Sequence, residues 1–151
     1  MPHRTRTWML AFIAGFIAVP IFHQGMLTVL GAIGLTGASV FSMEATWPFG
    51  LPRIWSLSFW GGVWGLALLA VHPYLPRGTN YWPSVAVFGA LGPTLVAWLV
   101  VGPLKGQSPG DGLSLAAVTT GLLVNAAWGL GTAALLAALR QPEGRLKPKY
   151  R

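Results

Sequence analysis

Four long apolar runs constrain the fold of this chain more than any other feature. They extend over about residues 8–30, 54–75, 84–104 and 113–139. A helix needs about 20 apolar residues to cross the roughly 30 Å hydrocarbon layer of a bilayer. The runs are too long for barrel strands and lack the alternation of such strands. We therefore expect an all-α integral membrane protein, with four transmembrane helices in a bundle.

The composition also indicates a membrane protein. Only 9% of the residues are charged, whereas a soluble domain has about 25% charged residues. The run that starts at Trp8 is much longer than the roughly 7–15 apolar residues of a cleavable signal peptide, so we interpret it as a retained helix. The chain has no cysteine, which excludes disulfides, thiolate metal sites and lipid anchors on cysteine.

The basic residues predict the orientation of the helices. With four crossings, eight of the ten Lys and Arg residues lie on one side, and only Arg53 and Lys105 lie on the other. Cytoplasmic segments carry the excess of Lys and Arg, so we expect both termini in the cytoplasm. Residues 1–140 then form the membrane domain, and residues 141–151 form a basic cytoplasmic tail.

The positive net charge of +7 indicates membrane lipids as partners rather than nucleic acid. The basic residues flank the apolar runs, where anionic headgroups attract them, and they form no basic stripe with interleaved aromatic residues. Arginine exceeds lysine, and alanine, glycine and proline are abundant, which is typical of a GC-rich bacterial gene. We therefore expect the bacterial inner (cytoplasmic) membrane as the location.

Small residues recur along the apolar runs in positions that favour close helix packing. Helices in lipid associate through close backbone approach and polar contacts. In the fourth run, small residues and one amide recur every four residues, which places them on one slowly drifting stripe. The candidate packing residues are Gly15, Gly61, Gly65, Gly121, Asn125 and Gly129. We expect packing within a four-helix bundle in preference to self-association, with Asn125 as an interhelical hydrogen-bond donor.

Polar side chains inside the apolar runs are candidates for function. Counting about 1.5 Å per residue from Trp8 places His23 in the outer third of the bilayer. Other polar residues belong to the same outer end and could converge with it beneath the long first loop. This outer cluster, for binding or for structure, consists of His23, Gln24, Glu44, Arg53 and Lys105, with Asp111 at the same end.

His23 carries the most specific hypothesis of this cluster. The stripe of Ala11, Gly15 and Val19 leads to His23 at four-residue steps, so we expect this side chain to face protein. Pro20 removes one backbone donor and loosens the helix there. We expect His23 to hydrogen-bond Glu44 or a loop carbonyl and to anchor the first loop. A ligand role and a proton-transfer role for His23 are the alternatives.

No pattern indicates catalysis, a metal site or a cofactor. His23 and Glu44 lack the spacing of metal ligands on helices, and the sequence contains neither a GxSxG nucleophile motif nor a phosphate-binding loop. His72 belongs to the opposite side of the membrane from His23, so these two histidines should not bind one haem. We name no catalytic residue, and an enzyme is not the function we favour.

Small size, little soluble mass and glycine-lined faces favour an accessory, structural or assembly subunit of a larger membrane protein complex. Such a subunit has other integral membrane subunits as partners. A small-molecule or ion carrier that acts as an oligomer is the first alternative. A protein that binds a cofactor or lipid through His23 is the second.

Overall fold

The computed structural model describes residues 3–108 and 113–140. Within this part the chain is mostly helical, and four helical spans are long and apolar enough to cross a membrane. They run over Arg4–Ala32, Arg53–Tyr74, Gly78–Leu104 and Leu115–Leu139. The sequence prediction of four such helices is therefore confirmed. The expected basic tail, residues 141–151, and Asp111 lie outside the described residues.

Each span is built from the following elements. The first consists of α1 (His3–Ala18), one π-helical turn η1 (Val19–His23) and α2 (Gln24–Ala32). The second consists of α3 (Arg53–Val71) and the 3-10 turn η2 (His72–Tyr74). The third consists of the 3-10 turn η3 (Gly78–Asn80), α4 (Tyr81–Val96), the π-helical turn η4 (Ala97–Val101) and α5 (Gly102–Leu104). The fourth is α6 (Leu115–Leu139).

Local sequence signals explain several helix ends. The first span ends before Gly34, whose φ of +74° belongs to the left-handed region that glycine adopts without strain. The last span begins after Ser114, whose Oγ accepts a hydrogen bond from the Ala117 N–H at 3.2 Å. The first helix starts at His3 rather than near residue 8, because backbone hydrogen bonding continues past the end of the apolar run.

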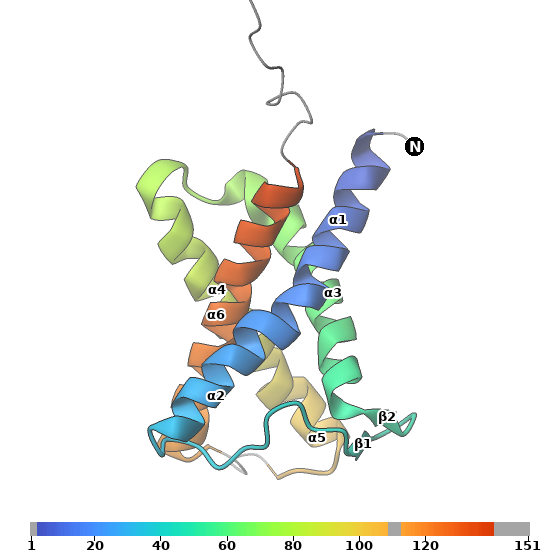
Figure 1. The fold of residues 1–151 in the computed structure, drawn as a ribbon, viewed down its shortest axis with the longest axis vertical. Helices are drawn as coiled ribbons and strands as arrows, with labels where there is room; N and C mark the ends of the chain where they lie inside the picture. Colours follow the sequence, from blue (N-terminus) through green and yellow to red (C-terminus); the bar gives the residue numbers. More distant parts are fainter. Residues whose placement is uncertain (1–2, 109–112, 141–151) are drawn as a thin grey trace, which may run out of the picture.

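The four spans form two helix pairs that α6 joins (Figure 1). The α1 helix packs against α3, the α4 helix packs against α6, and contacts between α1 and α6 connect the pairs. Each of the four buried apolar clusters contains one residue of α6: Trp128, Leu136, Val124 or Ala133. The last helix is therefore the central helix of the described bundle.

Glycines bring the backbones of α1 and α3 into contact. A Cβ atom added to Gly61 would lie 2.7 Å from the carbonyl oxygen of Gly15. One added to Gly65 would come still closer to the carbonyl oxygen of Ala11. Because real Cβ atoms do not approach backbone atoms so closely, larger side chains at these positions would force the two helices apart.

A second glycine contact holds α4 against α6. A Cβ atom on Gly129 would lie 3.0 Å from the Cα atom of Gly89 and 3.0 Å from the carbonyl oxygen of Val85. On the same stripe of α6, the Asn125 side-chain amide donates a hydrogen bond to Thr94 Oγ1 at 2.9 Å. The stripe that includes Asn125 and Gly129 is thus the face that α6 turns toward the third span.

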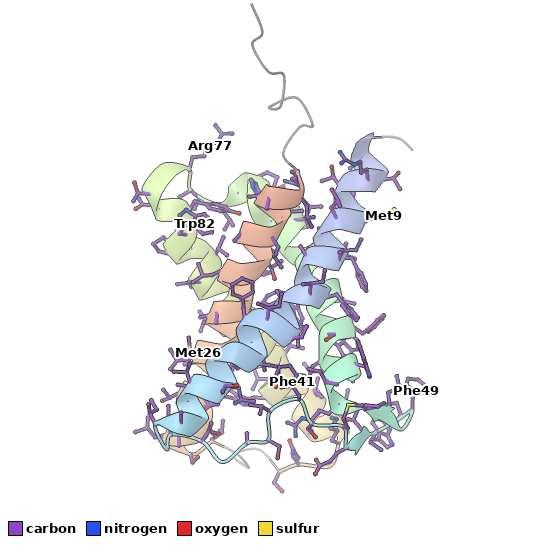
Figure 2. The ribbon with its side chains drawn as sticks, in the orientation of Figure 1. Met9, Met26, Phe41, Phe49, Arg77 and Trp82 are labelled. Carbon is purple, nitrogen blue, oxygen red and sulfur yellow. The ribbon has the colours of Figure 1, made fainter. Side chains whose placement is uncertain are left out.

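The two ends of the bundle differ in character. The long first loop and the short antiparallel hairpin of β1 (Ala45–Thr46) and β2 (Leu51–Pro52) lie at one end (Figure 1). The start of α1, the turn between α3 and α4 and the end of α6 lie at the other. Figure 2 shows Phe41 and Phe49 at the first of these ends and Arg77 at the second. We call them the loop end and the turn end.

Candidate functional site

The π-helical turn η1 decides which polar side chain of the first span becomes buried. The backbone N–H of Gln24 donates to the carbonyl of Val19, five residues earlier. Pro20, inside this turn, has no N–H and cannot make the α-helical hydrogen bond of its position. A π-helical turn holds one more residue than an α-helical turn. The buried stripe that passes through Val19 therefore continues at Gln24 rather than at His23.

Gln24 uses both ends of its side-chain amide at the loop end. The residue is only 2% exposed. Its Oε1 accepts a hydrogen bond from the Phe41 N–H at 2.8 Å, and its Nε2 lies 3.3 Å from His23 Nδ1. Because the amide nitrogen is a donor, His23 Nδ1 is the acceptor and carries no proton in this contact. Gln24 therefore anchors the first loop to the first span. We expected His23 to have this role, but the π-helical turn places Gln24 on the buried stripe instead.

The loop residue that Gln24 holds has an unusual backbone conformation. Phe41 adopts a φ of +49°, which is rare for a bulky side chain because its Cβ atom crowds the backbone. The hydrogen bond from its N–H to Gln24 Oε1 fixes the peptide group at this position. The contact thus ties a strained point of the loop to the first span.

Two further connections join this loop to the second and third spans. The first N–H groups of α3 donate to loop carbonyls, from Arg53 to Glu44 at 2.9 Å and from Ile54 to Ser42 at 3.1 Å. These bonds satisfy donors that have no partner within the helix. From the end of the third span, Lys105 Nζ donates to Thr46 Oγ1 at 3.4 Å.

The residues of the expected outer cluster differ in their burial. His23 and Gln24 form an inner pair, whereas the side chains of Glu44, Arg53 and Lys105 are exposed. The carboxylate of Glu44 accepts from Ser42 Oγ at 3.4 Å. Within residues 3–108 and 113–140, no three His, Asp or Glu side chains are grouped as metal ligands would be. The hydrogen bonds of Gln24, Arg53, Ile54 and Lys105 at this end connect the loop to the helices.

An interhelical hydrogen bond that the sequence did not predict lies inside the bundle. The indole Nε1 of Trp128 donates to the carbonyl oxygen of Gly15 at 2.9 Å, and both residues are buried. A Cβ atom on Gly61 would lie 3.2 Å from this indole nitrogen. The missing side chain at Gly61 therefore makes room for the indole between α1, α3 and α6. The only signal in the sequence was a tryptophan deep in an apolar run.

Five aromatic rings form a continuous surface on α1 and α3. Neighbouring ring centroids lie 5.8–6.4 Å apart from one ring to the next. Three of the side chains, on α3, are more than half exposed: 54% for Trp55, 52% for Phe59 and 57% for Trp60. We call this the aromatic surface; it consists of Trp55, Phe16, Phe12, Phe59 and Trp60, in the order of their ring contacts.

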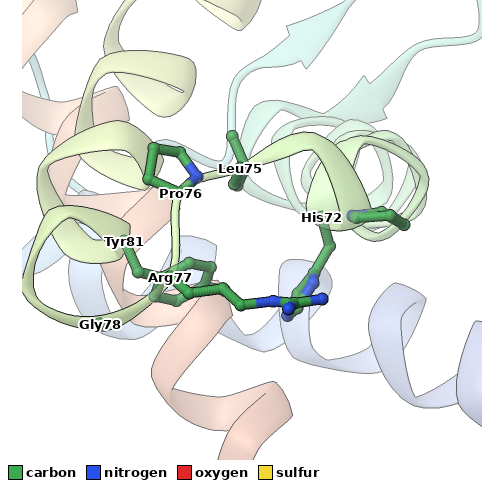
Figure 3. Close-up of a pocket in the computed structure, with 7 residues that line it drawn as sticks. His72, Leu75, Pro76, Arg77, Gly78 and Tyr81 are labelled. Carbon is green, nitrogen blue, oxygen red and sulfur yellow. The ribbon is translucent and has the colours of Figure 1, made fainter.

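The turn end contains two adjoining cavities. The larger, of about 300 Å³, is lined by the turn between α3 and α4, including His72, Arg77 and Tyr81 (Figure 3). The smaller, of about 130 Å³, shares His72 and Tyr81 and extends to Arg140 at the end of α6. The sequence pattern places His72 and Arg77 at this end, but it does not connect them with Arg140, which is more than 60 residues away in the chain.

Comparison of this chain with protein-family models, with curated proteins and with solved structures gives no match.

Proposed function

We propose that this chain is a multi-pass protein of the bacterial inner membrane and serves as an accessory or assembly subunit of a larger membrane protein complex. The observation that carries the proposal is the aromatic surface on α1 and α3. The partner is another integral membrane subunit that packs laterally against this surface.

The membrane location rests on the four apolar spans and on the positions of the charges. The start of α1, the turn between α3 and α4 and the end of α6 lie at the turn end (Figure 1) and contain Arg4, Arg77 and Arg140. The start of α3 and the end of the third span lie at the loop end and contain Arg53 and Lys105. Together with the basic residues that follow α6 in the sequence, this distribution favours the turn end as the cytoplasmic end.

The position of the aromatic surface favours a protein partner over an interfacial belt. Tryptophans concentrate at the membrane–water interface, but Trp60 follows Arg53 by about 10 Å of helix, at about 1.5 Å per residue. Phe12 and Phe59 continue the surface from α1 to α3. Large, rigid aromatic side chains contribute much of the contact area and energy of protein interfaces. An exposed group of them is a surface suited to another helix.

The interior of the bundle gives less support to a carrier function. Asn125 donates a hydrogen bond to Thr94, and Trp128 donates one to Gly15. These polar groups therefore pair within the bundle and do not line a path for a transported molecule. Two buried hydroxyls among the described residues, Ser58 Oγ and Thr120 Oγ1, have no hydrogen-bond partner. Neither group carries a charge that would attract an ion.

Co-purification from native membranes tests the accessory role. The tagged wild-type chain should retain defined partner subunits after extraction in a mild detergent. The double variant Phe59→Leu with Trp60→Leu should lose most of these partners, because the substitutions remove aromatic contact area and keep the surface apolar. Mass spectrometry of the purified material identifies and quantifies the partners.

A matched control changes lipid-exposed side chains of another helix. Leu91 and Leu95 on α4 are also exposed, and the double variant Leu91→Ala with Leu95→Ala should retain the partners. Thermal unfolding in detergent verifies that both variants remain folded. Purification of the wild-type chain without any stoichiometric partner, or equal retention of partners by both variants, would refute the proposal.

A further inference from the structure

The two cavities at the turn end adjoin each other between the second, third and fourth spans, and we call them together the recess. They share His72 and Tyr81, whose ring centroids lie 5.4 Å apart. The larger cavity, of about 300 Å³, far exceeds the volume of about 10–15 Å³ that a single water molecule requires. The recess can therefore accept a polar group of the size of a phosphate.

The side chains around this recess are basic, and none of the described lining residues is acidic. Arg77 extends across the larger cavity toward His72 (Figure 3). Arg140 lines the smaller cavity from the end of α6. Two guanidinium groups, one imidazole and the Tyr81 hydroxyl thus provide hydrogen-bond donors without a carboxylate among them.

Arg140 brings to the recess a buried hydrogen-bond donor that is unpaired among the described residues. Its Nε is buried and has no hydrogen-bond partner within the described part of the chain. A buried donor without an acceptor costs free energy, more so in a charged group. Phosphate oxygens match the planar, forked geometry of the guanidinium group. An anionic acceptor in the recess would satisfy this donor.

The smaller cavity is also lined by apolar side chains. They are Ala133, Leu136 and Ala137 of α6 and Trp82 of α4, which line the cavity together with Arg140. This arrangement fits an amphiphile whose charged group meets the arginines and whose apolar part contacts these side chains of α4 and α6. Basic pockets between membrane helices on the cytoplasmic side are known to bind anionic lipid headgroups.

We propose that His72, Arg77 and Arg140 form a binding site for a phosphate group in the recess at the turn end. The phosphate can belong to an anionic phospholipid or be free in solution, and the apolar walls favour the lipid. This site is separate from the aromatic surface on α1 and α3, so it does not depend on the accessory role.

The test uses the full chain in a neutral detergent. Phosphatidylglycerol, phosphatidylcholine with the same acyl chains, and inorganic phosphate are added in separate titrations. Native mass spectrometry measures bound lipid, and thermal unfolding measures stabilisation by each addition. We expect phosphatidylglycerol to bind and to raise the unfolding temperature more than phosphatidylcholine does. Competition by inorganic phosphate would identify free phosphate as the source, whereas failure to compete would identify the lipid.

Variants distinguish a specific site from general attraction to a basic surface. Arg140→Gln should weaken phosphatidylglycerol binding about tenfold, the loss expected for one hydrogen bond to a charged group. Arg77→Gln, on an exposed turn, is a second variant for the case in which Arg140→Gln impairs folding. Arg6→Gln is the matched control, because Arg6 is exposed at the same end and lines neither cavity.

Three results would overturn the proposal. The first is equal binding of phosphatidylglycerol and phosphatidylcholine, with no effect of inorganic phosphate. The second is an equal loss of affinity in Arg6→Gln and Arg140→Gln. The third is unchanged affinity when Arg140→Gln and Arg77→Gln are both folded.

Discussion

His23 and Gln24 are neighbours in the chain, yet they have different surroundings. One residue of an α-helix corresponds to a rotation of about 100°, so the π-helical turn at Val19–His23 changes which of them lies on the buried stripe. Gln24 is buried and bonded to Phe41 of the first loop, while His23 is half-buried beside it. At the scale of single residues, the amide rather than the imidazole connects the helix with the loop.

Gln24→Leu should release the first loop without unfolding the helices. Leucine keeps the buried volume but cannot accept the hydrogen bond from the Phe41 N–H. Loss of about 1 kcal/mol corresponds to roughly fivefold faster hydrogen exchange at residues 40–42. Exchange of the purified protein, followed by mass spectrometry, measures this change.

His23→Leu is the matched control for this prediction. It removes the partner of the Gln24 amide nitrogen but leaves the bond between Gln24 Oε1 and Phe41 in place. We expect little change in the exchange of the loop. Equal acceleration in both variants would show that Gln24 is not the anchor.

The helices α4 and α6 show how two glycines on one stripe differ in importance. Gly121 and Gly129 are two four-residue steps apart, so the sequence places both on the same stripe of α6. A Cβ atom on Gly129 would meet backbone atoms of α4 at 3.0 Å, whereas one on Gly121 would meet the side chains of Thr94 and Trp98 at 3.5 Å. The first distance requires the backbone of α4 to shift by a few tenths of an ångström, and the second is an ordinary van der Waals contact.

Gly129→Ala should therefore destabilise the bundle, and Gly121→Ala should not. Overpacking at a closely packed backbone costs about 1–3 kcal/mol, while a substitution without a clash changes the free energy of unfolding by about 0.5 kcal/mol or less. Chemical unfolding of both variants in the same detergent provides the comparison. Equal stability of the two variants would argue against the direct backbone contact between α4 and α6.

At the scale of the whole molecule, the two ends of the bundle define a testable orientation. The first loop and the turn between α3 and α4 lie at opposite ends (Figure 1). Ser39 in the loop and Thr79 in the turn are both exposed, and the chain contains no cysteine. A single cysteine at either position is therefore an unambiguous probe of the side on which that end lies.

We expect Ser39→Cys to react with a membrane-impermeant thiol reagent in intact cells. Thr79→Cys should react only after the membrane is permeabilised, because the excess of Lys and Arg at the turn end favours the cytoplasm. Gel-shift detection of the labelled chain measures both reactions. Labelling of Thr79→Cys in intact cells would contradict the proposed orientation.

Local properties of the sequence determined the number and approximate extent of the helical spans. A run of apolar residues of sufficient length is a local feature, and so is the recurrence of small residues such as Gly15 and Gly129. For this reason the four spans could be predicted closely. The polar character of position 24 was visible as well, but its burial depended on the irregular turn around Pro20.

Only the tertiary structure decided which distant residues meet. The bond from Trp128 to Gly15 and the recess that joins His72 to Arg140 connect separate spans. Such contacts depend on which helices pair and on how each is rotated about its axis. Backbone approach at the glycines sets the pairing, and the π-helical turn sets the rotation of α2. The pairing of helices and their rotation about their axes both depend on more than one segment. No local pattern in the sequence could therefore specify these contacts.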